Sequence, residues 1–289
     1  MSSNPTPSEP LAVWRTARFD LALDEPRIMG IVNLTPDSFS DGGSHVNARA
    51  ALAHCEQLLK DGAHLLDIGG ESTRPGARPL PLDEELARVM PVLREAVRLG
   101  VPVSVDTYKA GVMRAALDVG ADAINDVWAL RQPGARDAVA AHPRCGVCLM
   151  HMHGEPETMQ VAPMSGDPIA QVLSFWKLRV ADLRARGIEP ARISLDPGIG
   201  FGKTPAQNFA LLARQRELLA AGLPLLVGWS RKSSLGHATG LAEPRERLVP
   251  SVAAALLAAE RGARILRVHD ARETALALAV WRAARPGAG

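Results

Sequence analysis

The sequence predicts an α/β protein built as a (β/α)8 TIM barrel, preceded by a short N-terminal hairpin. Eight short apolar runs recur along the 289 residues, and such runs are typical of parallel strands that are buried on both faces. The segments between them repeat apolar residues at the three- and four-residue spacing of helices. Eight strand-helix units match the usual size of this barrel. A doubly wound open sheet also alternates strands with helices, but the count of eight favours the barrel.

The predicted elements follow one another regularly along the chain. Residues 11–24 predict the hairpin, which would cover the bottom of the barrel. The eight predicted strands are residues 28–33, 65–71, 103–106, 123–126, 147–151, 193–196, 225–230 and 265–269. Helical periodicity is clear over residues 50–59 and 86–97. Each strand ends on a polar or charged residue, and active sites in these barrels lie at the C-terminal ends of the strands. We therefore expect the functional residues at these eight ends.

Length and composition predict one folded domain, residues 11–285, after a flexible leader of residues 1–10 that is rich in Pro and Ser. Lys and Arg number 33, Asp and Glu 31, and the two signs are interspersed, so neither nucleic acid nor an anionic membrane is an expected partner. The N-terminus does not resemble a signal peptide, and no apolar run approaches the roughly 18 residues of a membrane span. We therefore expect a cytoplasmic protein.

The glycine-rich segment from Asp196 to Thr204 invites a nucleotide-binding interpretation, which its spacing contradicts. A phosphate-binding P-loop needs Gly where Pro197 stands, and a dinucleotide fingerprint needs Gly where Lys203 stands. What remains is an acid at a strand end, followed by glycines that allow the backbone to approach a flat ligand. Phe201 is available to cover such a ligand.

Two further short motifs have competing interpretations. His151 and His153 resemble the His-x-His pair of barrel metallohydrolases, but few other histidines stand at the strand ends to complete a metal site. Cys145 and Cys148 have the spacing of a thiol pair, but they lie in an apolar run without a partner pair. Core packing is the better interpretation of the two cysteines.

Four polar residues from distant parts of the chain would meet at the mouth of the barrel. They are Asp106, Asn125, Asp196 and Lys232. Two carboxylates, an amide and an ammonium suit a heterocycle that offers a guanidine-like donor edge and a carbonyl acceptor, because each carboxylate can accept two parallel N–H bonds. The sequence therefore predicts a site that recognises such a heterocycle. Structural roles for the same carboxylates are the alternative.

The last and first strands predict a neighbouring diphosphate site. Arg267 and His269 alternate at the end of the last strand, and Asn33 ends the first strand, its neighbour in a closed barrel. Barrels of this kind commonly bind phosphate near strands seven and eight. Residues 35–44 and 71–79 are rich in Gly, Pro and Ser, as expected of loops that close over a substrate, although ordinary turns are the alternative.

At these residues the chain resembles the dihydropteroate synthase family, which belongs to the pterin-binding enzymes of folate synthesis. The resemblance covers roughly residues 27–275 and rests on the segments Met29–Gly43, Asp67–Ala77, Ser104–Thr107, Ile124–Asp126, Leu149–Met152, Asp196–Lys203, Ser230–Ser233 and Arg267–His269. Enzymes of this family join the methylene of dihydropterin methyl diphosphate to the amine of p-aminobenzoate, with the help of Mg²⁺. They release diphosphate and dihydropteroate, and they are sulfonamide targets. The resemblance implies the same reaction here.

The resemblance also implies a role for each matching residue. The implied pterin site consists of Asp106, Asn125, Asp196, Phe201, Lys232 and Arg267. The implied diphosphate site consists of Asn33, Arg267 and His269, with Asn33 also touching the Mg²⁺. The implied p-aminobenzoate pocket consists of Thr73, Arg74, Pro75 and Ser230, and Asp37 and Phe39 of the first loop would help to close this pocket. The residues expected to act in catalysis are Arg267, His269, Lys232 and Asp106. The implied mechanism is dissociative, with diphosphate leaving before the amine attacks.

Departures from the family pattern are mild and remove no polar contact. Tyr108 stands where Ser is frequent and Trp229 where Met is frequent, and we expect Trp229 to lie beside the pocket. Family resemblance further implies a homodimer through the outer helices of residues 247–262 and 270–284. Two alternatives stay open at this point: a non-catalytic pterin-binding paralogue and a folate-dependent methyltransferase. His151 has no firm role.

Overall fold

The computed structural model describes residues 12–35, 44–72, 76–155, 158–159 and 161–285. Within these residues one sheet of eight parallel strands has the order β8-β7-β6-β5-β4-β3-β10-β9. The strands are β3 (Arg27–Asn33), β4 (Leu65–Gly69), β5 (Val103–Asp106), β6 (Ala123–Asp126), β7 (Gly146–Met150), β8 (Ile193–Asp196), β9 (Leu226–Val227) and β10 (Ile265–Val268). A parallel bridge between Leu195 and Leu225 joins the two ends of the sheet. The sheet therefore closes, which confirms the barrel over the doubly wound alternative.

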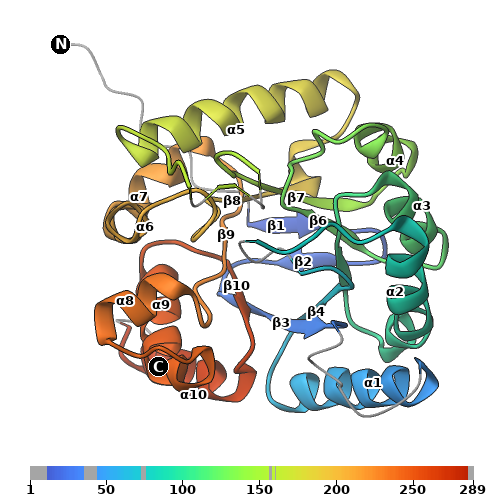
Figure 1. Cartoon of the computed structure of the whole chain (residues 1–289), viewed down its shortest axis with the longest axis horizontal. Helices are drawn as coiled ribbons and strands as arrows, with labels where there is room; N and C mark the ends of the chain where they lie inside the picture. Colours follow the sequence, from blue (N-terminus) through green and yellow to red (C-terminus); the bar gives the residue numbers. More distant parts are fainter. Residues whose placement is uncertain (1–11, 36–43, 73–75, 156–157, 160, 286–289) are drawn as a thin grey trace.

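Helices surround the strands on the outside (Figure 1). They are α1 (Ser44–Lys60), α2 (Leu82–Ala96), α3 (Ala110–Asp118), α4 (Ala135–Ala141), α5 (Pro168–Ala185), α6 (Pro205–Ala213), α7 (Gln215–Leu218), α8 (Ser233–Thr239), α9 (Leu248–Glu260) and α10 (Ala271–Ala283). The predicted helical segments 50–59 and 86–97 lie in α1 and at α2. Local sequence sets the helix starts: Thr204 and Gln207 form a capping box, and Pro205 is the first residue of α6.

The predicted strands are found within a few residues of their expected bounds. The largest difference is in residues 225–230, of which only β9, Leu226–Val227, is regular strand. A turn follows, in which the N–H of Lys232 donates to the carbonyl of Trp229 at 3.2 Å. The chain leaves the sheet early there because it enters α8 directly after Lys232, the residue that precedes the helix.

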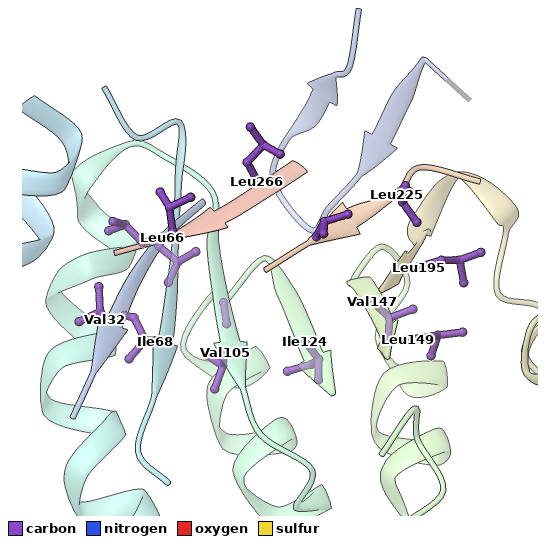
Figure 2. Close-up of a cluster of buried hydrophobic side chains, with 14 of the residues drawn as sticks. Val32, Leu66, Ile68, Val105, Ile124, Val147, Leu149, Leu195, Leu225 and Leu266 are labelled. Carbon is purple, nitrogen blue, oxygen red and sulfur yellow. The ribbon is translucent and has the colours of Figure 1, made fainter. Parts of the chain in front are cut away.

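The strands are buried on both faces, and the two faces differ in chemistry. Alternate residues point outward to the helices and form one continuous hydrophobic cluster. Figure 2 shows members of this cluster from around the barrel: Val32, Leu66, Ile68, Val105, Ile124, Val147, Leu149, Leu195, Leu225 and Leu266. The intervening residues form the interior of the barrel. Toward the C-terminal ends of the strands these interior residues are polar.

The predicted N-terminal hairpin is confirmed. Strands β1 (Val13–Arg15) and β2 (Asp20–Ala22) pair antiparallel. The fully buried Trp14 donates its indole N–H to the carbonyl of Arg192 at 3.0 Å. Its ring belongs to an apolar cluster at the N-terminal end of the barrel interior, composed of Trp14, Leu23, Met29, Leu65, Ala123, Cys148, Leu226 and Ile265. The hairpin therefore covers this end of the barrel.

The described residues also show the state of the cysteines and the character of the helices. Cys55, Cys145 and Cys148 are buried and not in disulfides, and burial raises the pKa of Cys145 to about 12, as expected of cysteines that pack in the core. Among the helices of the described part of the chain, none has the length and apolar character needed to cross a membrane.

Candidate active site

An ion-paired network crosses the interior of the barrel near the C-terminal ends of its strands. The guanidinium of Arg267 on β10 donates from Nε to Asp67 Oδ2 at 2.6 Å and from Nη2 to Asp106 Oδ2 at 2.7 Å. The amide of Asn125 on β6 donates to the same Oδ2 of Asp67 at 3.0 Å. Three residues predicted from separate strand ends, Arg267, Asp106 and Asn125, therefore belong to one connected set of groups.

Burial and charge set the proton affinities in this network. Burial raises the pKa of the Asp106 carboxyl to about 7; the positive charge of Arg267 opposes this rise, and the negative charge of Asp67 adds to it. Burial by itself would lower the pKa of Arg267, but the carboxylates of Asp67 and Asp106 outweigh it and hold that pKa above its usual value. Arg267 is therefore a permanent cation, whereas Asp106 is poised to exchange a proton near neutral pH.

The next part of the site is the loop that runs from Asp196 to Lys203, after β8. Asp196 is buried and accepts the N–H of Gly198 at 2.7 Å. Burial raises the pKa of Asp196, whereas the bond from Gly198 and the charge of Lys232 oppose that rise. Gly198 has φ +67°, and a Cβ there would lie 1.9 Å from the carbonyl oxygen of His151. Only glycine fits this position, because the loop packs directly on the end of β7.

Lys232, which precedes α8, lies beside Phe201 of this loop. The ammonium of Lys232 is 4.4 Å from the centre of the Phe201 ring. Phe201 itself packs with Val127, Met150, Met152 and Met159. The ends of β8 and β9 are thus side by side, and the Lys232 charge is close enough to influence Asp196. The structure brings these three predicted residues to one region of the rim.

Ser230 and His269 form a pair between the ends of β9 and β10. Ser230 Oγ lies 2.9 Å from His269 Nδ1 and also accepts the backbone N–H of His269 at 3.1 Å. Beside this pair, Arg231 donates to both carboxylate oxygens of Asp270, at 2.5 and 3.2 Å. The two cationic residues that follow β9 therefore have different neighbours. Arg231 pairs with Asp270, and Lys232 lies beside the loop that follows β8.

Of the six remaining predicted site residues, one lies in the described part of the chain and five lie outside it. Asn33 ends β3, where it pairs in register with Gly69 of β4 and is half-buried. The predicted loop residues lie outside the described part of the chain: Asp37, Phe39, Thr73, Arg74 and Pro75. Within the described residues, no group of three or more His, Cys, Asp or Glu side chains could hold a metal ion.

Comparison with known proteins agrees with this geometry. A sequence model of the family described as pterin binding enzyme matches residues 29–269. Over 276 residues the chain is 54% identical to the dihydropteroate synthase of Neisseria meningitidis serogroup B, an alignment that spans 94% of this chain and 97% of that one. This chain belongs to the dihydropteroate synthase family.

Solved structures of dihydropteroate synthases have the same fold. The structure of the Xanthomonas albilineans enzyme with 4-aminobenzoic acid has a TM-score of 0.89 and 52% identity, over 95% of this chain and 99% of that one. The Burkholderia cenocepacia enzyme complexed with 7,8-dihydropteroate has a TM-score of 0.87 and 49% identity, over 97% and 98% of the two chains. These relatives favour the synthase over the non-catalytic paralogue, the methyltransferase and the metallohydrolase.

Within this dihydropteroate synthase fold, His151 has a structural position. Its ring is buried and meets Phe175 edge to face at 5.1 Å, and burial together with the charge of Lys203 lowers its pKa to about 3. His153, by contrast, is exposed. The backbone of His151 supports the loop after β8, because its N–H donates to the carbonyl of Asp196 and its carbonyl accepts from Lys203. The end of β7 therefore supports the loop after β8.

The expected position of Trp229 is wrong. Its side chain belongs to the outer hydrophobic cluster and stacks on Phe209 of α6, with ring centres 5.4 Å apart. In this segment, which follows the end of β9, Ser230 contacts His269 whereas its neighbour Trp229 packs on the helix side. The departure from the family pattern at this position therefore affects helix packing.

Two residues with clear positions in the site were missed from the sequence. Asp67 joins Arg267 to Asn125, as described above, and its only signal is a charged residue inside an apolar run. Lys203 is buried, and its ammonium donates to three backbone carbonyls, those of His151, Gly198 and Phe201, at 3.3, 2.9 and 3.1 Å. These bonds hold the loop after β8 in shape. Nothing in the sequence distinguishes this lysine from a solvent-exposed one.

A third missed feature joins the ends of β4 and β5. Lys109 bonds to both Glu71 and the buried Glu85, the latter at 2.6 Å, and the hydroxyl of Tyr108 donates to Glu71 at 2.8 Å. Burial would lower the pKa of Lys109, but its bonds to the two carboxylates outweigh this and raise it. Tyr108, which differs from the usual family residue, thus adds a hydrogen bond at the start of the second loop.

Proposed function

We propose that this protein is a dihydropteroate synthase: it joins the methylene of dihydropterin methyl diphosphate to the amine of p-aminobenzoate and releases diphosphate. The single observation that supports this most strongly is the connected network of Arg267, Asp106 and Asn125, with Asp196 and Lys232 on the same rim. Carboxylates, an amide and an ammonium match the donor edge and the carbonyl of a pterin ring. The family relationship supports the same reaction.

In the proposed pterin site, Asp196 and Asp106 accept N–H bonds from the guanidine-like edge of the ring. Asn125 completes that edge, and Lys232 donates to the ring carbonyl. Phe201 covers one face, since its ring already lies beside the Lys232 ammonium. Because these groups stand on strand ends and on a loop held by Lys203, little reorganisation is needed when the pterin binds.

The proposed diphosphate site lies at the ends of β10 and β3. Arg267 keeps its positive charge at all relevant pH values, so it can stabilise the charge that develops on the leaving diphosphate. His269 and Asn33 add hydrogen bonds from the two neighbouring strands. In the proposed dissociative path the diphosphate leaves first, and the weakly nucleophilic amine captures the pterin cation. No strong general base is needed for that step.

Mg²⁺ is part of this proposal, and the donors present fit it. Magnesium usually keeps several waters and binds through one or two protein oxygens together with substrate phosphates. The amide oxygen of Asn33, at the end of β3, can serve as such a ligand. When bound, the ion would supply positive charge that stabilises the diphosphate.

The p-aminobenzoate pocket is proposed from the family resemblance, with Thr73, Arg74 and Pro75, and with Asp37 and Phe39 on the first loop. Closure of these two loops would exclude water from the pterin cation and so prevent its hydrolysis. The cytoplasmic location likewise stays a prediction.

We also propose a homodimer through α9 and α10, which pack against each other. Their outer faces carry exposed apolar side chains, Val249 and Leu257 on α9 and Leu276 and Val280 on α10. Replacing Val280 (71% exposed) with Glu should give monomers in analytical ultracentrifugation. Leu178→Glu is the matched control, because Leu178 on α5 is 72% exposed and lies on a different helix. A wild-type protein that sediments as a monomer would contradict the proposal.

The experiment that tests the activity supplies dihydropterin methyl diphosphate and Mg²⁺ and measures diphosphate release with and without p-aminobenzoate. We expect release to require the amine and to match dihydropteroate formation one to one. Release that ignores the amine would overturn the synthase assignment, and pterin binding without any release would support a non-catalytic pterin-binding protein.

A further inference from the structure

We infer that Ser230 is a positioning residue for His269, and that its hydroxyl holds the imidazole in the tautomer with hydrogen on Nε2. This inference rests on the proposed function for its kinetic consequences, but the tautomer can be tested without it. The resemblance assigned Ser230 to the p-aminobenzoate pocket; the structure instead places its hydroxyl against the histidine of the proposed diphosphate site.

The backbone explains why these two residues meet. Strands β9 and β10 are parallel neighbours in which Leu226 is paired with Ile265 and Val227 with Leu266. Ser230 and His269 have the same separation of 39 residues, and they meet just beyond the ends of these two strands. His269 follows β10 directly, two residues after Arg267, so the contact lies at the C-terminal ends of the strands. The contact is thus a consequence of sheet register and closure.

Among the described residues, the hydroxyl hydrogen of Ser230 has an acceptor with only one of the two tautomers of His269. Ser230 is buried, and its Oγ accepts the backbone N–H of His269 at 3.1 Å. Its one hydrogen is then available for Nδ1, 2.9 Å away. In the described residues Ser230 Oγ has no other hydrogen-bond partner. A hydroxyl that donates to Nδ1 requires a lone pair there, so the neutral ring carries its hydrogen on Nε2.

This arrangement directs a hydrogen-bond donor to the proposed diphosphate site. An Nε2–H group can donate to a phosphate oxygen, whereas the other tautomer presents a lone pair that repels it. Without the Ser230 hydroxyl the ring can adopt both tautomers, and part of the population no longer donates. The neighbouring ion pair between Arg231 and Asp270 joins the same two backbone segments through other side chains. That pair offers a matched control.

The kinetic test compares Ser230→Ala, His269→Gln and the double variant, with kcat and KM measured for each substrate. Ser230→Ala should lower kcat/KM for the pterin diphosphate about 3- to 10-fold and leave the KM for p-aminobenzoate unchanged. The double variant should resemble His269→Gln alone, because the serine acts through the histidine.

Ser230→Thr, which keeps the hydroxyl, should restore activity, and Asp270→Asn should leave the kinetics unchanged. Additive losses, or a change confined to the KM for p-aminobenzoate, would overturn the inference.

A spectroscopic test does not depend on catalysis. The ¹⁵N chemical shifts of the His269 ring, assigned by difference with His269→Gln, should show an unprotonated Nδ1 and a protonated Nε2 in the wild type. Ser230→Ala should shift the Nδ1 signal toward that of a mixture of tautomers. If wild-type His269 carries its hydrogen on Nδ1, the inference is wrong even when the enzyme is active. If the tautomer is as expected but no dihydropteroate forms, the proposed function fails and the positioning contact stands.

Discussion

The two ends of the barrel interior are built from the same strands and have opposite chemistry. At the N-terminal end, Leu65, Ala123 and Ile265 join the apolar cluster beneath Trp14. Two residues further along the same strands stand Asp67, Asn125 and Arg267, which form the polar network. A shift of two residues keeps the side chains on the same face of the sheet. Each strand therefore supports folding at one end and the proposed chemistry at the other.

Buried carboxylates show the same contrast. Asp122, just before β6 near the N-terminal end, accepts hydrogen bonds on both oxygens from Arg18 and the N–H of Val103. Asp67, near the C-terminal end, has one oxygen that accepts two bonds and a second, Oδ1, that is buried with no partner among the described residues. A satisfied carboxylate stabilises the fold, whereas an incompletely satisfied one is typical of functional sites.

The largest effect on stability is expected from a substitution in the apolar cluster at the N-terminal end of the barrel. Trp14→Ala should lower the free energy of unfolding by about 3–5 kcal/mol, because it leaves a cavity and removes the bond to Arg192. Urea unfolding measures this loss. The KM values of the protein that remains folded should not change. Val13→Ala, on the same short strand but partly exposed, is the control and should cost little.

Substitutions at the C-terminal ends of the strands should instead reduce activity more than stability. Asp196→Ala and Lys232→Ala should each reduce kcat/KM for the pterin diphosphate by about 100-fold, since each removes a charge-assisted bond of about 1.5–3 kcal/mol to the ring. The urea midpoint of Lys232→Ala should stay close to that of the wild type, and that of Asp196→Ala should fall less than that of Trp14→Ala, because among the described residues only the N–H of Gly198 loses its acceptor. Near-normal turnover in either variant would show that the residue does not bind the pterin.

Asp67→Asn should affect both catalysis and stability, because Asp67 lies between the apolar cluster and the rim. The substitution keeps the shape of the side chain but removes the charge paired with Arg267. We expect a loss of about tenfold in kcat/KM together with a loss of about 1–3 kcal/mol in stability. Steady-state kinetics and urea unfolding on the same preparation test both. A variant that loses only stability would place Asp67 with the folding residues.

The smallest expected effect is a pH dependence. Because the pKa of Asp106 is raised to about 7, its carboxylate is lost as the pH falls below that value, and kcat/KM for the pterin diphosphate should fall with it. In Asp67→Asn this decline should move to lower pH, since the Asp67 charge raises the pKa of Asp106. The folded state also binds more protons than the unfolded state between about pH 4 and about pH 7, so ionisation of Asp106 lowers stability as the pH rises through that range. An unshifted profile in the variant would rule out Asp106 as the titrating group.

Many of the polar residues at the strand ends could be predicted from the sequence, whereas the hydrogen bonds and ion pairs between them could not. Apolar runs that end in Asp106, Asn125 and Asp196 are local patterns, and parallel strands must bring their C-terminal ends to one rim. The roles of Asp67 and Lys203 were missed because both depend on partners far away in the chain. Trp229 was misplaced because the early end of β9 concealed which of its neighbouring residues face inward.

Local sequence patterns are sufficient to predict the fold class, the hairpin, most of the strand ends and the family. Periodicity and motif spacing are properties of a few consecutive residues, and these decide which segments form strands and helices. The pairing of the polar groups is set in the folded chain: Arg267 meets Asp67 and Asp106, Lys203 meets three carbonyls, and Ser230 meets His269. Those contacts depend on the register between strands and on closure of the barrel between Leu195 and Leu225, which no local segment encodes.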